Sequence, residues 1–431
     1  MPGGLLTDYY ELNMAASYLR RAMTGPATFS LFAHRLPPDR GFLVAAGLED
    51  CLAYLENLSF TEEDLAWLAG EGFSERDMAA FAALRFTGDV RAVPEGTVVF
   101  AGEPLLEVTA PAAEAQLAET ALLNHITFQT AIATKATRCV LAAAGAECVD
   151  FSFRRTQGIG AGLAVARASV IAGFAATSNT EAARRYGLRA SGTMAHSFVE
   201  AFASEAEAFT AFAEDFPART TFLVDTYDTA QGIRAAIGVA HERGLVSLGV
   251  RLDSGDLAAQ AAAARSMLDD AGLPQARIFA SGGLDEYVIA GLVAAGAPID
   301  AYGVGTKMGV SADAPYLDTA YKLVEFAGRP VRKLSEGKET IPYPKQVHRG
   351  DGRDILTHRD APSPAGYQPL LRPVMRAGKR LTPPEPLTTI SDRRAASLTT
   401  LGPATLALRH PVPWQVTLSP ELTATPAADP R

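Results

Sequence analysis

The segment TFLVDTYDTAQGIRAAIGVAHERGLVSLGVRLDSGD, residues 221–256, carries the pattern that decides the fold. It holds a short apolar run, a polar turn that begins at Asp225, an alanine-rich stretch with helical spacing, and a second apolar run that ends just before Asp253. Strand and helix patterns that alternate in this way predict parallel strands joined by helical crossovers.

The same unit repeats from about residue 145 to residue 307. The turns at Asp225, Asp253 and Ser281 lie 28 residues apart, and Gly305 follows 24 residues later. The apolar runs predicted to be strands are Glu147–Phe151, Ile171–Ala176, Thr221–Val224, Ser247–Leu252, Arg277–Ala280 and Ala301–Val304. A closed barrel and an open doubly wound sheet both fit this signal. The number of strands favours an α/β fold with an irregular (β/α) TIM-like barrel.

The sequence on either side of the repeat predicts a second, mixed α/β domain built from both chain ends. We expect an N-terminal domain over residues 1–135, with a small antiparallel β module at about 86–109 where alternation is broken by Gly and Pro. A helix over about 112–143 leads into a barrel domain over 136–345. The segment 346–431 then returns to the N-terminal domain, and its last ten or so residues are expected to be disordered.

Composition excludes several classes of protein. The chain of 431 residues has 39 Lys and Arg against 48 Asp and Glu, a net charge of −9, so a nucleic-acid-binding surface is not expected. No stretch approaches the ~18 uninterrupted apolar residues of a membrane-spanning helix. The first residues lack a secretory signal, so a cytoplasmic location is expected. Cys51, Cys139 and Cys148 are odd in number and far apart, which predicts buried thiols, not disulfides or a zinc site.

Polar residues and glycines follow most of the predicted strands, where parallel α/β folds bind their ligands. The stretches Ser281–Gly283 and Gly303–Thr306 suit a phosphate, because glycine lets backbone N–H groups approach an oxyanion at the start of a helix. The alternative is that these glycines only permit tight turns.

An arginine pair, Arg154 and Arg155, also follows a predicted strand. Guanidinium groups at a strand end can bind a carboxylate or a phosphate through two parallel hydrogen bonds, although ordinary surface arginines are the alternative. The glycines at 158–162 match a dinucleotide-binding fingerprint only loosely, and the acidic partner of that fingerprint is missing.

His196 is the candidate nucleophile, base or phosphoryl acceptor. It lies among small residues, and Asp225 or Asp253 from neighbouring strand ends could hold its ring; a purely structural histidine is the alternative. Carboxylates within residues 251–256 could bind a sugar diol or waters around Mg²⁺, and no His-rich metal-ligand pattern occurs.

Taken together, these motifs resemble those of the nicotinate phosphoribosyltransferase family, over the range from Leu6 to about Arg349. The resemblance is carried by Leu6–Glu11 (LTDYYE), Phe151–Arg155 (FSFRR), Thr177–Asn179 (TSN), Gly192–Ser197 (GTMAHS), Val224–Asp228 (VDTYD), Arg251–Asp256 (RLDSGD), Ser281–Gly283 (SGG) and Tyr302–Thr306 (YGVGT). It implies an enzyme of NAD salvage that joins nicotinate to phosphoribosyl pyrophosphate, giving nicotinate mononucleotide and pyrophosphate, with ATP hydrolysed to ADP and phosphate. It also implies Mg²⁺ bound mainly through substrate phosphates, and a homodimer with its active sites at the interface.

The resemblance further implies roles for single residues. His196 would be phosphorylated by ATP, Asp225 would orient it, and Asp253 would contact the ribose or the base. The nicotinate site would comprise Tyr10, Phe153, Arg154, Arg155, Ser197 and Arg251, with Tyr10 stacked on the pyridine ring from the other subunit. The phosphates and the phosphoribosyl group would be bound by Thr177, Ser178, Asn179, Ser254, Gly255, Ser281, Gly282, Gly283, Gly303, Gly305 and Thr306.

Two departures from the family pattern and several rival functions stay open at this point. Ser152 stands where the family commonly has glycine, and we expect it to crowd the base pocket. Residues 341–345 replace a more basic stretch, so altered phosphate or ATP contacts are expected there.

Nicotinamide phosphoribosyltransferase is the nearest alternative function, and the Arg154–Arg155 pair favours nicotinate because a carboxylate needs cationic partners. A non-catalytic relative used for ligand sensing is the alternative from another class. Quinolinate phosphoribosyltransferase and a phosphosugar aldolase or isomerase explain fewer of the motifs.

Overall fold

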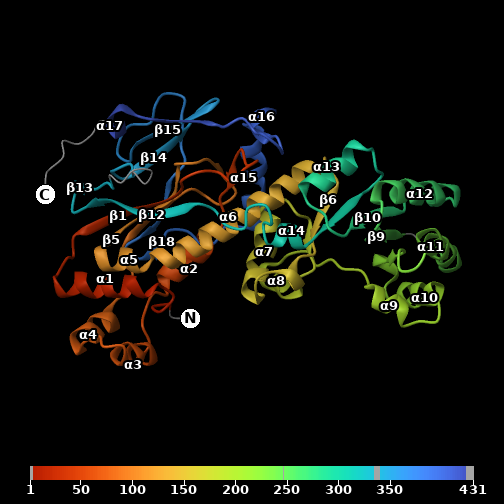
Figure 1. Cartoon of the computed structure of the whole chain (residues 1–431), viewed down its shortest axis with the longest axis horizontal. Coiled ribbons are helices and arrows are strands. Elements are labelled where there is room, and N and C mark those ends of the chain that lie inside the picture. Colours follow the sequence, from red (N-terminus) through yellow and green to blue (C-terminus); the bar gives the residue numbers. More distant parts are fainter. Residues whose placement is uncertain (1–2, 246, 334–339, 424–431) are drawn as a thin grey trace. The chain divides into compact units, whose positions relative to one another are not determined.

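The computed structural model describes residues 3–245, 247–333 and 340–423 (Figure 1). The chain divides into two compact units: unit 1 comprises Met1–Ala131 and Tyr316–Arg431, and unit 2 comprises Ile132–Pro315. Unit 2 ends at Pro315, whereas the sequence analysis places the end of the second domain at residue 345, because β12 (Thr319–Phe326) pairs with β1 (Pro26–Ala33) inside unit 1. The disorder predicted for the end of the chain lies outside the described residues.

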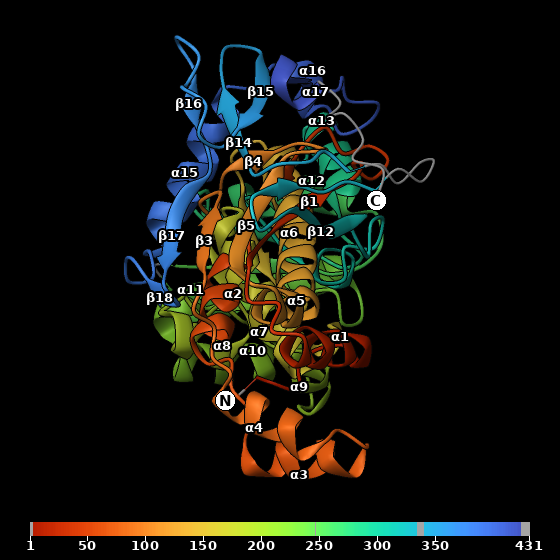
Figure 2. The same ribbon diagram turned by 90° about the vertical axis from the view of Figure 1, so that its left-hand side faces the viewer.

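Unit 1 is built on an antiparallel sheet whose strands come from both ends of the chain (Figure 2). Among the described residues its order is β13 (Arg329–Pro330), β12, β1, β5 (Pro104–Pro111), β3 (Asp89–Ala92), β17 (Arg372–Arg376) and β18 (Lys379–Arg380). The β module predicted at about 86–109 is therefore not separate. Its strands β3 and β5 belong to this sheet, and β4 (Val98–Val99) pairs with β2 (Leu43–Val44).

The C-terminal segment forms a smaller sheet in the same unit. Its strand order is β16 (Gln368–Pro369), β14 (Lys345–Arg349), β15 (Arg353–His358) and β19 (Gln415–Leu418), and only the pair of β15 and β19 is parallel. The helices of the unit are α1 (Tyr9–Arg20), α2 (Leu48–Glu56), α3 (Glu62–Gly70), α4 (Glu75–Ala83), α5 (Ala112–Leu117), α15 (Leu387–Thr399), α16 (Pro403–Leu406) and α17 (Pro420–Thr423). The helix predicted over about 112–143 is present as α5 and α6 (Glu119–Ala142).

The core of unit 1 is made of inward-facing strand residues and helix faces. Leu31 and Leu106 on neighbouring strands are fully buried, and the rings of Phe29 and Tyr321 stack with their centroids 4.7 Å apart. Buried apolar area of this kind is the main stabilising contribution in a domain, at about 25 cal/mol per Å². This burial stabilises β1 as an interior strand of the sheet, between β12 and β5.

Unit 2 holds the repeated strand–helix pattern, and its strands form one parallel sheet. The order is β7 (Ala176–Thr177), β6 (Glu147–Asp150), β11 (Ala301–Val304), β10 (Arg277–Ser281), β9 (Gly249–Leu252) and β8 (Thr221–Leu223). Every ladder between these strands is parallel. All four residues of β11 are buried, as expected for a strand with both faces covered. The predicted α/β fold with parallel strands is confirmed.

The closed barrel is not confirmed. Among the described residues β7 and β8 end the sheet, and no ladder joins them. The run Ile171–Ala176 is predicted as a strand, but its first residue is the last residue of α7 (Ile159–Ile171). The chain then turns at Gly173, which has a φ of 98°, and the strand that follows, β7, has only the two residues Ala176 and Thr177. Residues 190–193 then make a single bridge, between Thr177 and Ala190, and line a cavity together with Thr220 and Thr221.

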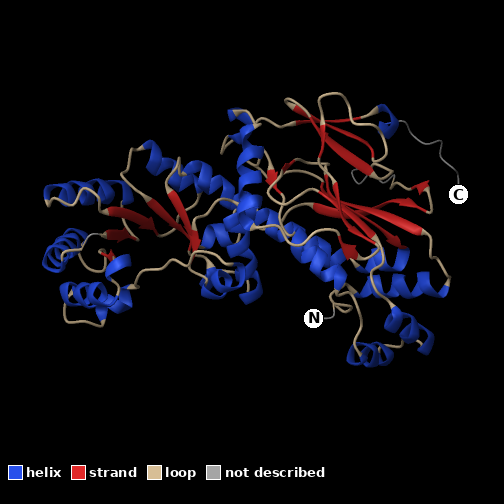
Figure 3. Ribbon diagram, turned by 180° about the vertical axis from the view of Figure 1, so that it is seen from behind, coloured by secondary structure: helices blue, strands red, loops and turns tan. Residues whose placement is uncertain are grey.

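The helices of unit 2 surround its strands (Figure 3). After α7 they are α8 (Thr180–Tyr186), α9 (His196–Glu200), α10 (Glu205–Asp215), α11 (Thr229–Arg243), α12 (Leu257–Asp270), α13 (Glu286–Ala294) and α14 (Thr306–Gly309). Three of them start with an aspartate whose carboxylate accepts hydrogen bonds from free backbone N–H groups: Asp228, Asp256 and Asp285. These caps anchor each helix directly behind a strand end.

Cys51, Cys139 and Cys148 are free thiols buried in the described structure, and burial raises the pKa of the Cys148 thiol to about 12. No helix in the described part of the chain is long and apolar enough to span a membrane.

Candidate functional site

Two adjoining cavities open at the carboxyl ends of the strands in unit 2, where the sequence predicts a site. The first, of about 340 Å³, is lined by Phe153, Thr193, Met194, His196 and other residues. The second, of about 330 Å³, is lined by Arg155, Lys307 and both glycine-rich turns. Four residues belong to both walls: Phe151, Arg154, Arg251 and Asp253. The two cavities therefore form one site with an aromatic compartment and a cationic, glycine-rich compartment.

Arg251, the third residue of β9, connects the elements around this site. Its guanidinium donates to the Ser281 hydroxyl at the end of β10 (2.8 Å) and to Thr193 Oγ1 and the Met194 carbonyl oxygen (both 3.2 Å). It also pairs with Asp253 Oδ1 at 2.9 Å and lies 5.3 Å from the centroid of the Phe151 ring. One side chain thus fixes three segments from different parts of unit 2.

Asp253 and Asp225 follow neighbouring strands and differ in their surroundings. Burial alone would raise the pKa of Asp253, but hydrogen bonds from Ser281 and Arg251 outweigh it and lower that pKa, which keeps the carboxylate ionised. Asp225 is 2% exposed, and its Oδ2 accepts from the Asp253 backbone N–H and from Ser254 Oγ, both at 2.8 Å. Its Oδ1 is buried without a hydrogen-bond partner among the described residues.

His196 begins α9, and its ring lies beside both carboxylates. Nε2 is 4.0 Å from Asp225 Oδ1 and 4.0 Å from Asp253 Oδ2, and Nδ1 is 3.2 Å from Thr226 Oγ1. The side chain is 39% exposed and lines the aromatic compartment. A distance of 4.0 Å is too long for a hydrogen bond, so Nε2 forms none with either carboxylate and is open to a reacting group.

The glycine turns bring backbone close to the second compartment. Gly282 has a φ of 91°, and a Cβ added there would lie 1.9 Å from the carbonyl oxygen of Asp253. At residue 303 a Cβ would lie 2.7 Å from the Phe151 ring. Both positions therefore require glycine, and the turns present main-chain groups to the cavity at the start of α14 and just before α13.

Replacing Gly282 with alanine is expected to lower kcat/KM for a phosphorylated substrate about 100-fold or more, since the Asp253 backbone must shift and carry its carboxylate with it. Steady-state kinetics checks this expectation. The matched control is Gly238→Ala in the middle of α11, where a Cβ meets nothing within 4 Å. That variant should keep full activity and gain up to about 1 kcal/mol of stability. Equal losses in both variants would contradict the role given to the turn.

The structure brings together most of the predicted site residues. His196, Asp253, Phe153, Arg154, Arg155, Arg251, Ser178, Ser281, Gly282, Gly283, Gly303, Gly305 and Thr306 all line one or both cavities. Arg154 contributes to both compartments, whereas Arg155 lines only the glycine-rich one. Asp225 supports the site from behind through Ser254 and the backbone of Asp253.

Other predicted residues do not line the two cavities. Thr177 is buried and donates to Asp150 Oδ2 at 2.7 Å, and Asn179 caps α8 and donates to the Gly162 carbonyl oxygen at 3.1 Å. Ser152 is also buried and bonded to Asp150, through its hydroxyl at 2.6 Å, so it does not crowd the base pocket as expected. Ser197 and Gly255 lie outside both walls.

Tyr10 and the segment 341–345 belong to unit 1. Tyr10 lies on α1 with 48% of its surface exposed. Lys345 is buried, donates to the carbonyl oxygens of Ile341 (3.1 Å) and Tyr343 (2.8 Å), and lies 3.8 Å from Glu107. Burial lowers the pKa of Lys345 to about 8. Its ammonium group is engaged inside unit 1 and is not free to bind a phosphate.

Eight lining residues were not among the predicted site residues, and three of them carry an aromatic ring, a hydroxyl or an ammonium group: Phe151, Thr193 and Lys307. Lys307 pairs with Asp285 at 2.8 Å, which ties α14 to the cap of α13 behind the two glycine turns. All three stand within or directly after the motifs quoted above, so their position at strand ends was the available signal.

Comparison with known proteins follows the same division of the chain. Models of the N-terminal domain of nicotinate phosphoribosyltransferase, of the nicotinate phosphoribosyltransferase family and of its C-terminal domain match residues 5–127, 146–341 and 356–425, respectively. The nicotinate phosphoribosyltransferase pncB2 of Mycobacterium tuberculosis (strain ATCC 25618 / H37Rv) is 49% identical over 387 residues, which cover 88% of this chain and 83% of the relative. The human nicotinate phosphoribosyltransferase is 32% identical, with 97% and 95% of the two chains covered.

Solved structures agree with this similarity. The crystal structure of human nicotinic acid phosphoribosyltransferase superposes with a TM-score of 0.86 at 29% identity, covering 97% of this chain and 98% of that one. A nicotinate-nucleotide pyrophosphorylase from Pyrococcus furiosus gives a TM-score of 0.77 at 25% identity, with 92% and 95% covered. With a site of this composition at the expected strand ends, the chain belongs to the nicotinate phosphoribosyltransferase family of enzymes.

Proposed function

We propose that this chain transfers the phosphoribosyl group of phosphoribosyl pyrophosphate to nicotinate, in the salvage of NAD. The bond between ribose C1 and the pyrophosphate oxygen breaks, and the pyrophosphate leaves with the electron pair. The lone pair of the pyridine nitrogen forms the new bond to C1, which gives nicotinate mononucleotide. No proton has to be removed from the nitrogen, so positioning and charge stabilisation are the main tasks of the protein.

One observation carries the proposal: the two compartments share Phe151, Arg154, Arg251 and Asp253. An aromatic acid in the first compartment and a phosphorylated sugar in the second would meet at these shared residues. Phe151 offers a ring face to the pyridine, Arg154 offers a cation to its carboxylate, and Asp253 faces the ribosyl carbon, where positive charge develops.

The phosphates would bind in the second compartment. The turns at 281–283 and 303–306 would present backbone N–H groups to the 5′-phosphate, and Arg155 and Lys307 would add positive charge. The described residues contain no group of three or more His, Cys, Asp and Glu that could hold a metal. Asp225 and Asp253 fit a Mg²⁺ ion that takes most of its ligands from substrate phosphates and water, and that ion would neutralise charge on the leaving pyrophosphate.

His196 would couple ATP hydrolysis to this reaction. Its Nε2 would accept the γ-phosphoryl group as the bond between that group and ADP breaks, and water would later release phosphate. Support comes from the open Nε2, from the contact of Nδ1 with Thr226, and from the buried Oδ1 of Asp225, which lies 4.0 Å from Nε2 and accepts no hydrogen bond among the described residues.

The working enzyme would be a homodimer in which Tyr10 of one subunit reaches the site of its partner. Tyr10 and Leu6 at the start of unit 1 are 48% and 63% exposed, as expected for side chains that a partner covers. Neither the Tyr10→Ala nor the His196→Ala protein should show ATP-stimulated activity by itself. Mixing the two should restore ATP-stimulated activity in mixed dimers, because each such dimer holds one intact site. Mixtures as inactive as their components, with dimers present, would contradict shared sites.

Substrate choice is tested with the purified protein, phosphoribosyl pyrophosphate and Mg²⁺, with and without ATP. Nicotinate should be used with a kcat/KM about 10- to 150-fold above that for nicotinamide, because a hydrogen bond to a charged partner contributes about 1.5–3 kcal/mol. Arg154→Ala should reduce this preference, and Arg155→Ala should mainly raise KM for phosphoribosyl pyrophosphate. Equal use of nicotinate and nicotinamide would favour the alternative function, and no product with either would favour a sensing role.

A further inference from the structure

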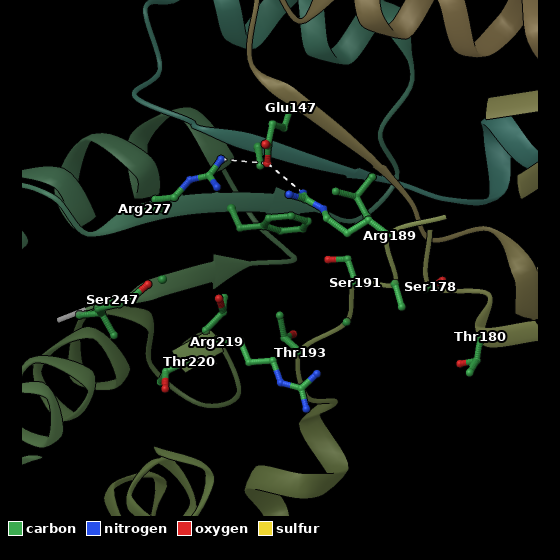
Figure 4. Close-up of a pocket in the computed structure, with 18 residues that line it drawn as sticks. Glu147, Ser178, Thr180, Arg189, Ser191, Thr193, Arg219, Thr220, Ser247 and Arg277 are labelled. Atoms are coloured by element: carbon green, nitrogen blue, oxygen red, sulfur yellow. Dashed lines mark hydrogen bonds and ion pairs between the residues drawn. The ribbon is translucent and has the colours of Figure 1, made fainter. Parts of the chain in front are cut away.

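A larger cavity, of about 420 Å³, lies at the opposite, amino-terminal edge of the parallel sheet (Figure 4). Its wall includes the first residue of five strands: Glu147, Thr221, Gly249, Arg277 and Ala301. This cavity shares Ser178, Gly192 and Thr193 with the aromatic compartment, but its described wall does not include His196, Arg251, Asp253 or the glycine-rich turns.

The charge of this cavity is strongly positive, although the chain as a whole is acidic. Arg189, Arg219 and Arg277 line it, and Glu147 is the only acidic residue in its described wall. Arg277 and Arg189 converge on Glu147 Oε2, at 3.1 and 3.4 Å (Figure 4). One carboxylate shared by two guanidinium groups leaves most of their hydrogen-bond donors unused.

Arg219 lies on the other side of the cavity, near Thr220 (Figure 4). Its guanidinium lies 5.0 Å from the centroid of the Phe216 ring and forms no ion pair with the described carboxylates. Seven serine and threonine residues complete the polar wall, Ser191 and Ser247 among them. A wall with three arginines, seven hydroxyls and a single acid provides many donors and few anionic acceptors, which is the composition that binds an oxyanion.

We propose that the cavity binds a small molecule that carries phosphate groups, as a second site that adjoins the aromatic compartment at Ser178, Gly192 and Thr193. The cationic wall disfavours an apolar ligand, and the single carboxylate disfavours a divalent cation. The volume exceeds that of either catalytic compartment, so a phosphate or a pyrophosphate group fits within it.

A ligand there would contact the segment that carries His196. Ser191 and Gly192 line this cavity, and Ser191 donates its backbone N–H to the Thr177 carbonyl oxygen at 2.9 Å. Gly192 and Thr193 line both this cavity and the aromatic compartment, and Thr193 and Met194 accept hydrogen bonds from Arg251 in the catalytic site. A ligand bound in the second cavity therefore contacts the segment 191–196, which carries both His196 and two acceptors of Arg251.

Equilibrium dialysis of the full chain against radiolabelled inorganic pyrophosphate tests the proposal without using activity as the readout. The wild-type protein should bind two pyrophosphates per chain, one at each edge of the sheet. Arg219→Glu should lose one of them or weaken it at least tenfold, and Gly282→Ala should lose the other. The matched control is Arg184→Ala, an exposed arginine of α8 that pairs only with Glu181 and should retain both.

Arg219 is the better residue to replace because its guanidinium forms no ion pair with the described residues that the substitution would break. Replacing Arg277 would remove the shorter of the two ion pairs of Glu147. The unfolding midpoint of Arg219→Glu should equal that of the wild type, and a parallel Arg277→Ala variant should show the same missing site. Binding of one pyrophosphate by the wild type, abolished by Gly282→Ala and untouched by Arg219→Glu, would overturn the second site. Because the readout is binding, that result would leave the proposed transferase function standing.

Discussion

Replacing His196 with alanine is expected to remove the stimulation of the reaction by ATP and to leave the ATP-independent rate of phosphoribosyl transfer in place. The imidazole touches neither the glycine turns nor Arg251, so both compartments should still bind their substrates. Coupling between two sites is typically about 1–3 kcal/mol. The loss should therefore amount to about a 5- to 150-fold fall in kcat/KM measured with ATP.

Two measurements check this expectation. Product formation with and without ATP gives the stimulation factor, and incubation with γ-labelled ATP gives the acid-labile label on the protein. His241→Ala is the control, since His241 lies on α11, outside both compartments, and its Nε2 lies 3.0 Å from the Ala271 carbonyl oxygen. Undiminished ATP stimulation in the His196→Ala protein would rule out the phosphohistidine. Loss of the ATP-independent rate as well would assign the imidazole a direct part in the transfer.

Replacing Arg251 with alanine is expected to have the largest effect of any single change in the site. The variant loses hydrogen bonds to Ser281, Thr193, Met194 and Asp253, and it leaves the half-buried Asp253 carboxylate with much less compensation. Removing one partner of such a pair typically costs about 3–5 kcal/mol. We expect kcat/KM for nicotinate to fall about 10²- to 10³-fold or more.

The pH dependence of kcat/KM distinguishes the effect of Arg251 on the Asp253 carboxylate from a general loss of structure in the variant. In the wild type, hydrogen bonds from Ser281 and Arg251 lower the pKa of Asp253. Without Arg251 that pKa should rise, so the acid limb of the kcat/KM profile should move to higher pH. Arg251→Lys keeps a positive charge and should show a smaller shift with an intermediate kcat/KM. An Arg251→Ala profile parallel to that of the wild type would show that Asp253 is not the group that titrates.

The sequence was sufficient to place the chemistry at one edge of the sheet and to nominate Asp225 and Asp253 as the carboxylates beside His196, but the strand pattern does not say what Asp228 and Asp256 do. Asp225 and Asp228 follow β8, and Asp253 and Asp256 follow β9, with the same spacing. In the structure the first of each pair faces His196, and the second caps a helix. The difference depends on where each helix begins, which only the packed backbone decides.

Asp150 shows a second reason why prediction stopped short. It is fully buried at the end of β6, where burial raises its pKa and hydrogen bonds from Ser152 and Thr177 oppose that rise. These two hydroxyls were expected near substrates, yet they satisfy a carboxylate that the strand pattern gave no reason to single out. Which polar side chain turns inward to a buried partner depends on contacts between segments far apart in the sequence.

Long-range pairing also explains the two points at which the observed fold differs from the expected one: the end of unit 2 and the open edge of its parallel sheet. β12 pairs with β1 although nearly 300 residues separate them, and nothing in the local pattern of residues 319–326 indicates that partner. Closure of the parallel sheet likewise depends on whether residues 190–193 reach β8, which is a matter of tertiary geometry. Local periodicity predicts strands, whereas their partners follow from the assembled core.

The nesting of unit 2 inside the sequence of unit 1 has a consequence for synthesis of the chain on the ribosome. All of Ile132–Pro315 leaves the exit tunnel before β12, so unit 2 can fold while β1 still lacks its neighbour on one side. Until translation reaches residue 326, that open strand edge is free to pair with another nascent chain. A stalled or truncated polypeptide should therefore aggregate through unit 1, while its parallel sheet is already complete.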